Sequence, residues 1–306
     1  MRLPVFFVSI LLLLSTSMTS FAQTDGASLD ERGYGLYIPT SYDEEATNNL
    51  PLVIALHGFG DTWENFYQAT GLVNRAEQDN FIVAFPQGYL NQWNDGSIGD
   101  HEEDDIQLLR DLITRIERDY RVDTERIYLV GFSNGGTMVF RAACEAPDLF
   151  AGIVSIAGTM RSAQAPDCEE ASLPVMIIHG TGDEVVPFEG SVYRYSVTSG
   201  VTFWAMQNGC DLESVPPFND ALFRNGFRTY FFEDCADGNY VLFHAIENGG
   251  HSYPGAGAYL QGLTPQPAFT DTARLIWGFF EITYQAKLSA EDTPEITPEA
   301  TETSDD

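Results

Sequence analysis

One stretch of sequence decides the fold, Arg126-Ile127-Tyr128-Leu129-Val130-Gly131-Phe132-Ser133-Asn134-Gly135-Gly136. Its first half is a short apolar run that predicts a buried strand. Its second half is Gly-x-Ser-x-Gly, and the residues that follow it are typical of a helix. A serine at a sharp turn between a strand and a helix is the arrangement called a nucleophile elbow. Gly131 and Gly135 lack a Cβ, so strand and helix can approach closely around a strained serine backbone.

Outward from this stretch, apolar runs alternate with segments of helical spacing. The expected strands are 34–39, 51–58, 80–86, 126–132, 149–156, 173–180, 228–232 and 240–246. The expected helices are 63–79, 106–120, 137–143, 202–208 and 270–284. Several strands are continuously apolar, which is typical of strands covered on both faces. The pattern predicts an α/β fold with a mostly parallel central sheet and helices on both faces.

The two ends of the chain differ in composition from the body. Residues 1–22 have a positive start, an apolar run from Val5 to Leu14 and small residues before a cut after Ala22. This pattern predicts a secretory signal peptide, and hence an extracellular or periplasmic protein. We expect a polar leader at 23–32, one catalytic domain at 33–286 and a disordered acidic tail at 287–306.

Charge excludes two classes of partner. The formal net charge is −30, and Lys287 is the only lysine. Such a surface repels nucleic acid and anionic lipid, so we expect neither as a partner. No segment after the signal peptide approaches the length of a membrane span. The oligomeric state is not readable from the sequence.

Four cysteines in an exported chain indicate disulfides: Cys144, Cys168, Cys210 and Cys235. They allow three connectivities, which the sequence alone does not distinguish. Our hypothesis joins sequence neighbours, Cys144 to Cys168 and Cys210 to Cys235. We expect no metal, because there is no C-x-x-C pair and the acids between 95 and 104 match no calcium loop.

A serine nucleophile needs a base, and the base needs an orienting carboxylate. His251 lies on a glycine-rich loop after the last expected strand, and is therefore the candidate base. His57 and His179 stand in His-Gly pairs at strand ends, where we expect structural roles. His244 falls inside a strand, and His101 lies upstream of Ser133. The candidate acid is Asp183, which follows the strand 173–180 directly; a turn or cap role is its alternative, and Asp211 and Asp237 are the fallback candidates.

Acyl transfer also requires backbone N–H groups that stabilise an oxyanion. Asn134, the residue after the nucleophile, would supply one of them. The loop His57-Gly58-Phe59-Gly60 would supply the other, from the Phe59 amide or, as the reserve, from Gly58.

Together these motifs resemble secreted α/β-hydrolases of the group that contains feruloyl esterases and polyhydroxybutyrate depolymerases. The resemblance spans about Tyr34 to Tyr284. It rests on the run 51–58, Phe85-Pro86-Gln87-Gly88 with Trp93, Asp104-Asp105, the elbow 131–136, His179-Gly180-Thr181-Gly182-Asp183, Asn208-Gly209-Cys210 and Gly249-Gly250-His251-Ser252-Tyr253-Pro254-Gly255. The family often has Trp where Tyr253 stands.

The resemblance implies hydrolysis of carboxylic esters without a cofactor, with Ser133, Asp183 and His251 as the triad. Trp93 and Tyr253 are the aromatic residues predicted to line the acyl pocket, with Phe59 and Trp63 as further candidates. The expected substrate is an aromatic, feruloyl-type acyl ester of plant polysaccharide. The alternatives are a hydroxyalkanoate polyester or its oligomers, a peptide, and a catalytically inactive binding protein; the last usually lacks the serine or the histidine.

Overall fold

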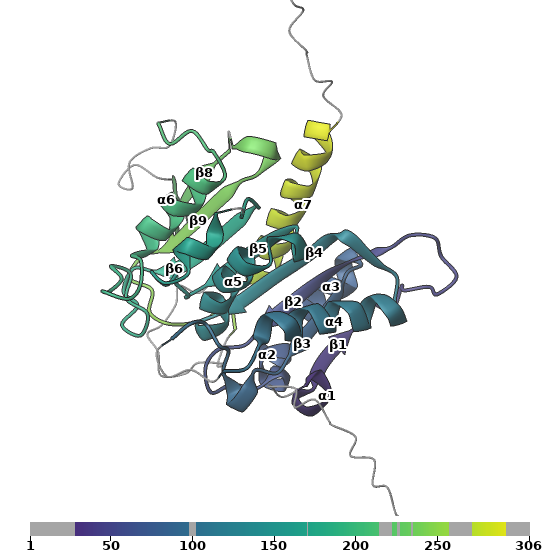
Figure 1. Ribbon diagram of the computed structural model, residues 1–306. Helices are drawn as coiled ribbons and strands as arrows, with labels where there is room; N and C mark the ends of the chain where they lie inside the picture. Colours follow the sequence, from purple (N-terminus) through teal and green to yellow (C-terminus); the bar gives the residue numbers. More distant parts are fainter. Residues whose placement is uncertain are drawn as a thin grey trace, which may run out of the picture.

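A single twisted sheet forms the centre of the computed structural model (Figure 1). The structure describes residues 28–97, 102–169, 171–213, 222–224, 227–233, 235–256 and 271–291. The predicted signal peptide, His101 and residues 292–306 of the predicted tail lie outside these ranges.

In the described residues, nine strands pair in the order β1-β3-β2-β4-β5-β6-β9-β8-β7. Their bounds are β1 Tyr34–Tyr37, β2 Leu50–Leu56, β3 Ile82–Pro86, β4 Val122–Phe132, β5 Gly152–Ile156, β6 Val175–Gly180, β7 Leu222–Arg224, β8 Phe227–Phe232 and β9 Val241–Ile246. The six strands from β3 to β9 in this order run parallel, and β1, β7 and β8 pair antiparallel. The prediction of a mostly parallel sheet is confirmed.

Helices cover both faces of this sheet (Figure 1). The α-helices are α1 Leu29–Arg32, α2 Trp63–Ala69, α3 Leu72–Asp79, α4 Asp105–Asp119, α5 Asn134–Glu145, α6 Val197–Gln207 and α7 Thr272–Glu291. Short 3-10 turns are η1 Tyr89–Asn91, η2 Pro147–Leu149, η3 Ala165–Cys168 and η4 Ala236–Gly238.

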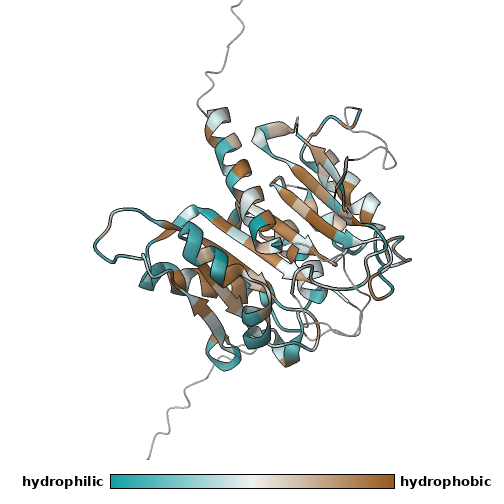
Figure 2. Cartoon of the chain, turned by 180° about the vertical axis from the view of Figure 1, so that it is seen from behind, coloured by the Kyte–Doolittle hydropathy of each residue, from teal (hydrophilic) through white to brown (hydrophobic). Residues whose placement is uncertain are grey.

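Each face of the sheet has its own hydrophobic core, because successive side chains of a strand point to opposite faces. Leu52, Ile54 and Leu56 of β2 pack with α4, α5 and α6. Val53 and Ala55 of the same strand pack with α2, α3 and α7. Figure 2 shows the result: apolar strands in the interior and hydrophilic residues on the outer sides of the helices.

Several predicted boundaries were wrong, and three of them bear on the fold. The helix expected over 63–79 is two helices, because Gly71 between α2 and α3 has a φ of 72°. The last helix extends to Glu291, so the tail expected from 287 begins as ordered helix. The leader expected at 23–32 contains α1, whose Arg32 forms an ion pair with Asp105. The strand β7 was not predicted.

The structure contains both disulfides of the predicted pairing, Cys144–Cys168 and Cys210–Cys235. They span 24 and 25 residues of sequence, for which loop-closure entropy suggests about 3 kcal/mol each. Cys235 precedes β9, whereas His251 follows that strand. The second disulfide therefore anchors the start of β9, at the end away from the histidine loop.

Truncation tests the corrected end of α7. A Cβ built on Gly238 of η4 would lie 3.5 Å from Cα of Lys287, so the last turns of α7 pack on this segment. Deleting 285–306 should lower the melting temperature by about 2–4 °C or more. Deleting only 292–306 should leave it unchanged, because that segment has almost nothing apolar to bury. Equal melting temperatures for the two truncations would contradict the role given to the end of α7.

Candidate active site

Ser133 stands between β4 and α5 with φ 55° and ψ −116°. This is a backbone conformation that non-glycine residues rarely adopt, and it is typical of functional sites. The serine N–H donates to the Ile156 carbonyl at 2.8 Å, and the serine carbonyl accepts from the Thr137 N–H at 2.9 Å. The turn is therefore held by the neighbouring strand on one side and by the helix on the other.

Two glycines make this turn possible. A Cβ on Gly131 would lie 2.2 Å from the Gly135 carbonyl oxygen, and a Cβ on Gly135 would lie 2.5 Å from the carbonyl oxygens of Leu56 and His57. No side chain fits at such distances. The end of β4 and the start of α5 thus approach to backbone contact around Ser133, as the elbow pattern predicts, and the start of α5 also contacts the backbone at the end of β2.

The sheet order brings the loops of the other two candidate residues together. Asp183 follows β6 and His251 follows β9, and these two strands are parallel neighbours. The Gly182 N–H donates to the Gly249 carbonyl at 2.8 Å, and the Asn248 N–H donates to Thr181 Oγ1 at 2.8 Å. These bonds hold the histidine loop against the aspartate loop.

One hydrogen-bond chain joins the three predicted residues. His251 Nε2 lies 2.7 Å from Ser133 Oγ, and His251 Nδ1 lies 2.7 Å from Asp183 Oδ2. His251 is 6% exposed and Asp183 is 5% exposed. An ionised Asp183 requires that Nδ1 carry the proton, so Nε2 is free to accept the serine proton.

Asp183 is held as a carboxylate by its surroundings. Burial alone would raise its pKa, but His251 and the Val186 amide outweigh that effect, so the pKa lies below its usual range. Oδ1 accepts the Val185 and Val186 N–H groups at 2.9 Å and 2.8 Å. The turn role that the sequence left open for Asp183 is thus filled by Oδ1, while Oδ2 contacts His251.

The other described histidines have structural contacts. His57 bonds the backbone at Gly58 and Gly88, and His179 Nε2 lies 2.9 Å from the Val186 carbonyl oxygen. His244 contacts Thr229 Oγ1 at 2.9 Å on the neighbouring strand. These positions match the structural roles expected from the sequence.

The segments predicted to supply the oxyanion hole flank Ser133. Asn134 is the first residue of α5, so its N–H belongs to the unpaired end of a helix. A Cβ on Gly58 would lie 3.4 Å from Ser133 Cβ, which places the 57–59 loop directly beside Ser133. The Phe59 side chain is 71% exposed.

Both residues predicted to line the acyl pocket are buried instead. Trp93 is fully buried, and its indole N–H donates to the His57 carbonyl at 2.9 Å. Tyr253 is 3% exposed and packs edge-on against Phe66 and Phe132. The polar residues around Trp93 suggested an exposed loop, but they turn inward to bond the elbow. Trp93 and Tyr253 therefore pack in the interior next to the site and do not form part of its exposed surface.

Sequence reasoning missed a buried ion pair beside the elbow. Asp95 is 1% exposed and accepts from Arg161 Nε at 2.9 Å and from Asn134 Nδ2 at 3.0 Å. The sequence indicated Asp95 only as one of several loop acids. Arg161 follows β5, so the rule that functional residues lie at the carboxyl ends of parallel strands could have found it.

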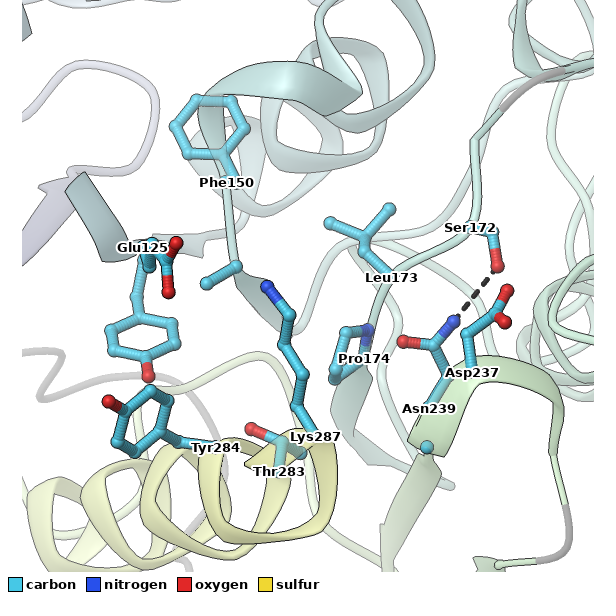
Figure 3. Close-up of a pocket in the computed structure, with 13 residues that line it drawn as sticks. Glu125, Phe150, Ser172, Leu173, Pro174, Asp237, Asn239, Thr283, Tyr284 and Lys287 are labelled. Atoms are coloured by element: carbon cyan, nitrogen blue, oxygen red, sulfur yellow. Dashed lines mark hydrogen bonds between the residues drawn. The ribbon is translucent and has the colours of Figure 1, made fainter. Parts of the chain in front are cut away.

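A cleft of about 200 Å³ lies at the amino ends of the parallel strands, away from Ser133 (Figure 3). It is lined by residues that precede β5, β6 and β9, and by Lys287 of α7. Asp237, a fallback candidate for the catalytic acid, is among them. Its position at the amino ends of the strands separates Asp237 from Ser133.

In the ranges that the structure describes, no helix has the length and hydropathy to cross a membrane. The same ranges contain no group of three metal-ligating side chains. Asp104, one of the acids weighed for a metal, caps α4 by accepting from the Gln107 N–H at 2.9 Å.

Comparison with known proteins gives a family and a fold. Residues 42–202 match the family described as phospholipase/carboxylesterase. Feruloyl esterase B of Piromyces equi is 32% identical over an alignment of 221 residues, and the match covers 66% of this chain and 39% of that protein. "Probable feruloyl esterase C" of Aspergillus niger is 28% identical over 231 residues, 73% of this chain and 77% of that protein.

A solved structure, the acetyl xylan esterase of Aspergillus awamori, matches with a TM-score of 0.59 and 16% identity. The match covers 84% of this chain and 96% of that one. It confirms the predicted α/β-hydrolase fold. Several curated relatives are longer than the matched region: the chain spans 66%, 39% and 32% of three of them.

Substitution of Ser133 and His251 by alanine tests whether these two residues carry out ester hydrolysis. Ser133→Ala and His251→Ala should each lower kcat by about 10⁴-fold or more, and the double variant should lose little beyond either single one. The melting temperature of Ser133→Ala should stay near wild type, whereas His251→Ala should lower it, because that change removes the buried partner of the Asp183 carboxylate. Ser172→Ala, at the opposite edge of the sheet, is the matched control and should keep normal turnover. Hydrolysis by Ser133→Ala at the wild-type rate would refute the assignment.

Buried histidines make stability depend on pH. Burial lowers the pKa values of His57 and His179, and lowers the pKa of His244 to about 4. In the unfolded chain, His244 becomes protonated below about pH 6.5, whereas in the folded protein its ring stays neutral until about pH 4. The free energy of unfolding should therefore fall as the pH drops through this window, by about 3 kcal/mol for His244 alone.

Thermal unfolding between pH 7.5 and 4 measures this effect. His244→Asn should be less stable at pH 7.5 but show a shallower decline toward acid pH. Parallel declines in the variant and the wild type would show that His244 does not contribute.

Proposed function

The chain belongs to the phospholipase/carboxylesterase family, and we propose that it hydrolyses carboxylic esters with Ser133 as its nucleophile. The observation that carries the proposal is the continuous chain from Ser133 Oγ through His251 to Asp183, with both contacts at 2.7 Å. It lies at the carboxyl edge of a parallel sheet, where α/β proteins place their ligands.

In the proposed reaction, Ser133 Oγ attacks the ester carbonyl while His251 Nε2 takes the hydroxyl proton. The tetrahedral oxyanion accepts hydrogen bonds from the N–H groups of Phe59 and Asn134. As the intermediate collapses, His251 returns the proton to the leaving alcohol. Water then attacks the acyl-enzyme by the same route, and the carboxylic acid is released. Asp183 stays ionised and stabilises the imidazolium that forms in each step.

We propose an aromatic acyl ester of plant polysaccharide as the substrate. Large apolar side chains are exposed on loops that follow three strands at the Ser133 edge: Phe59 at 71%, Leu90 at 75% and Val185 at 59%. The Gly60 N–H donates to the Asn91 carbonyl at 2.7 Å, so the first two loops are neighbours. Exposed apolar groups around a polar site fit an aromatic acyl group. The feruloyl esterases named above support the same class.

The proposal extends to location and domain limits. We propose that the catalytic domain spans 29–291, with α1 included because Leu29 is buried in the core and Arg32 pairs with Asp105, and that the protein is exported, extracellular or periplasmic. The signal-peptide pattern of residues 1–22 supports export. Two disulfides support it as well, because oxidised cysteine pairs persist in such compartments.

A panel of esters tests the function. The purified mature protein should hydrolyse methyl ferulate and aryl acetates, with Ser133→Ala as the blank. Faster release from methyl ferulate than from hydroxybutyrate oligomers would support the proposed substrate. Preference for the oligomers would favour the polyhydroxyalkanoate alternative. Absence of hydrolysis of every ester above the Ser133→Ala blank would overturn the proposed function.

A further inference from the structure

Trp93 lies between the two segments that would supply the oxyanion hole. Its backbone N–H donates to Asn134 Oδ1 at 2.7 Å, and its carbonyl accepts from Asn134 Nδ2 at 3.0 Å. Its indole N–H donates to the His57 carbonyl at 2.9 Å. One fully buried residue thus bonds both the start of α5 and the end of β2.

On the α5 side, these bonds fix the residue that follows the nucleophile. Asn134 presents both ends of its side-chain amide to the backbone of Trp93, which leaves the side chain one orientation. Asp95 accepts a further bond from Asn134 Nδ2 at 3.0 Å, and Arg161 pairs with this carboxylate. Three groups therefore hold Asn134 while its own N–H stays available to a ligand.

On the β2 side, the bonds fix the peptide that carries the Phe59 N–H. The Gly88 N–H donates to His57 Nε2 at 3.0 Å, so the proton of this neutral ring is on Nδ1. Nδ1 then donates to the Gly58 carbonyl at 2.8 Å. That carbonyl shares a planar trans peptide with the Phe59 N–H, which must point the opposite way. Trp93 holds the preceding carbonyl, at His57.

We infer that Trp93 is a positioning residue that sets the spacing of the two oxyanion-hole amides. The inference rests on the proposed function, because it assigns a role within that reaction. Backbone donors stabilise a developing oxyanion only when they are fixed before the charge forms. The hydrogen bonds of Trp93 to Asn134 and to the His57 carbonyl hold both donor segments in place, and Trp93 is fully buried while doing so.

The alternative is that Trp93 is only a large core residue. The chain offers a matched control, because Trp204 of α6 is equally buried. Within the described residues, its indole nitrogen has no hydrogen-bond partner. Trp93→Phe and Trp204→Phe therefore remove similar volume, but only the first removes a bond to the 57–59 loop.

The experiment compares the two variants in the full-length mature protein. The readouts are kcat and KM on an aryl acetate, the Ki of a trifluoromethyl ketone that forms an oxyanion on the serine, and the melting temperature. Trp93→Phe should lower kcat by about 10- to 100-fold and raise the Ki of the ketone by a similar factor. KM should change by about twofold or less. Trp204→Phe should lower the melting temperature by a similar amount and leave kcat within about twofold of wild type.

Asn134→Ala provides a second test that does not depend on core packing, since this side chain is half-buried and the backbone N–H remains. It should reproduce the losses in kcat and in ketone affinity. Combined with Trp93→Phe, it should give less than the product of the two single effects, because each variant loosens Trp93 at a different bond, the first at its backbone and the second at its indole N–H.

Three outcomes would overturn the inference: equal kcat losses in the two tryptophan variants, ketone affinity unchanged in Trp93→Phe, or full turnover in Asn134→Ala. If Trp93→Phe fails to fold, Asn134→Ala decides alone. Failure of the proposed function is distinguishable, because Ser133→Ala would then hydrolyse esters like the wild type.

Discussion

The backbone contact between the end of β2 and the start of α5 is the constraint on which the site depends. Gly135 lies so close to the carbonyls of Leu56 and His57 that no side chain fits between them. This contact brings the 57–59 loop beside Ser133 and requires the strained turn at the serine. Each of the other site residues is then placed by the order of the parallel strands. The geometry of the site therefore depends first on the close packing at Gly135, and the hydrogen bonds among the polar side chains depend on that packing.

The parts of the site that follow from chain order could be predicted from the sequence. Parallel strands end at one edge of a sheet, so residues that directly follow strands are expected to gather there. Ser133, Asp183 and His251 all satisfy this condition, and the structure brings them into contact. The two disulfides were predicted as pairs of sequence neighbours, and the structure contains them.

Features that depend on partners distant in sequence were not predictable. The polar residues around Trp93 indicated an exposed loop, but their partners are Asn134 and Arg161, which lie about 40 and 66 positions away. No local pattern indicates such pairs. The break between α2 and α3 is different, because Gly71 was visible in the sequence but was outweighed by the helical spacing on either side. The extension of α7 depends on packing against η4, which the composition of its last turn does not indicate.

The disulfides have a consequence for how the molecule opens. Both cross-links join segments of the layer that contains α5 and α6, on one face of the sheet. The opposite layer of α2, α3 and α7 packs by apolar contact, and none of the four cysteines belongs to it. Cooperative units of different stability are common within one domain. The layer that contains α5 stays covalently joined when the molecule partly opens, whereas neither disulfide restrains the layer of α2, α3 and α7. Proteolysis and amide exchange should therefore begin in the layer without disulfides, while Ser133 stays with the part that remains folded.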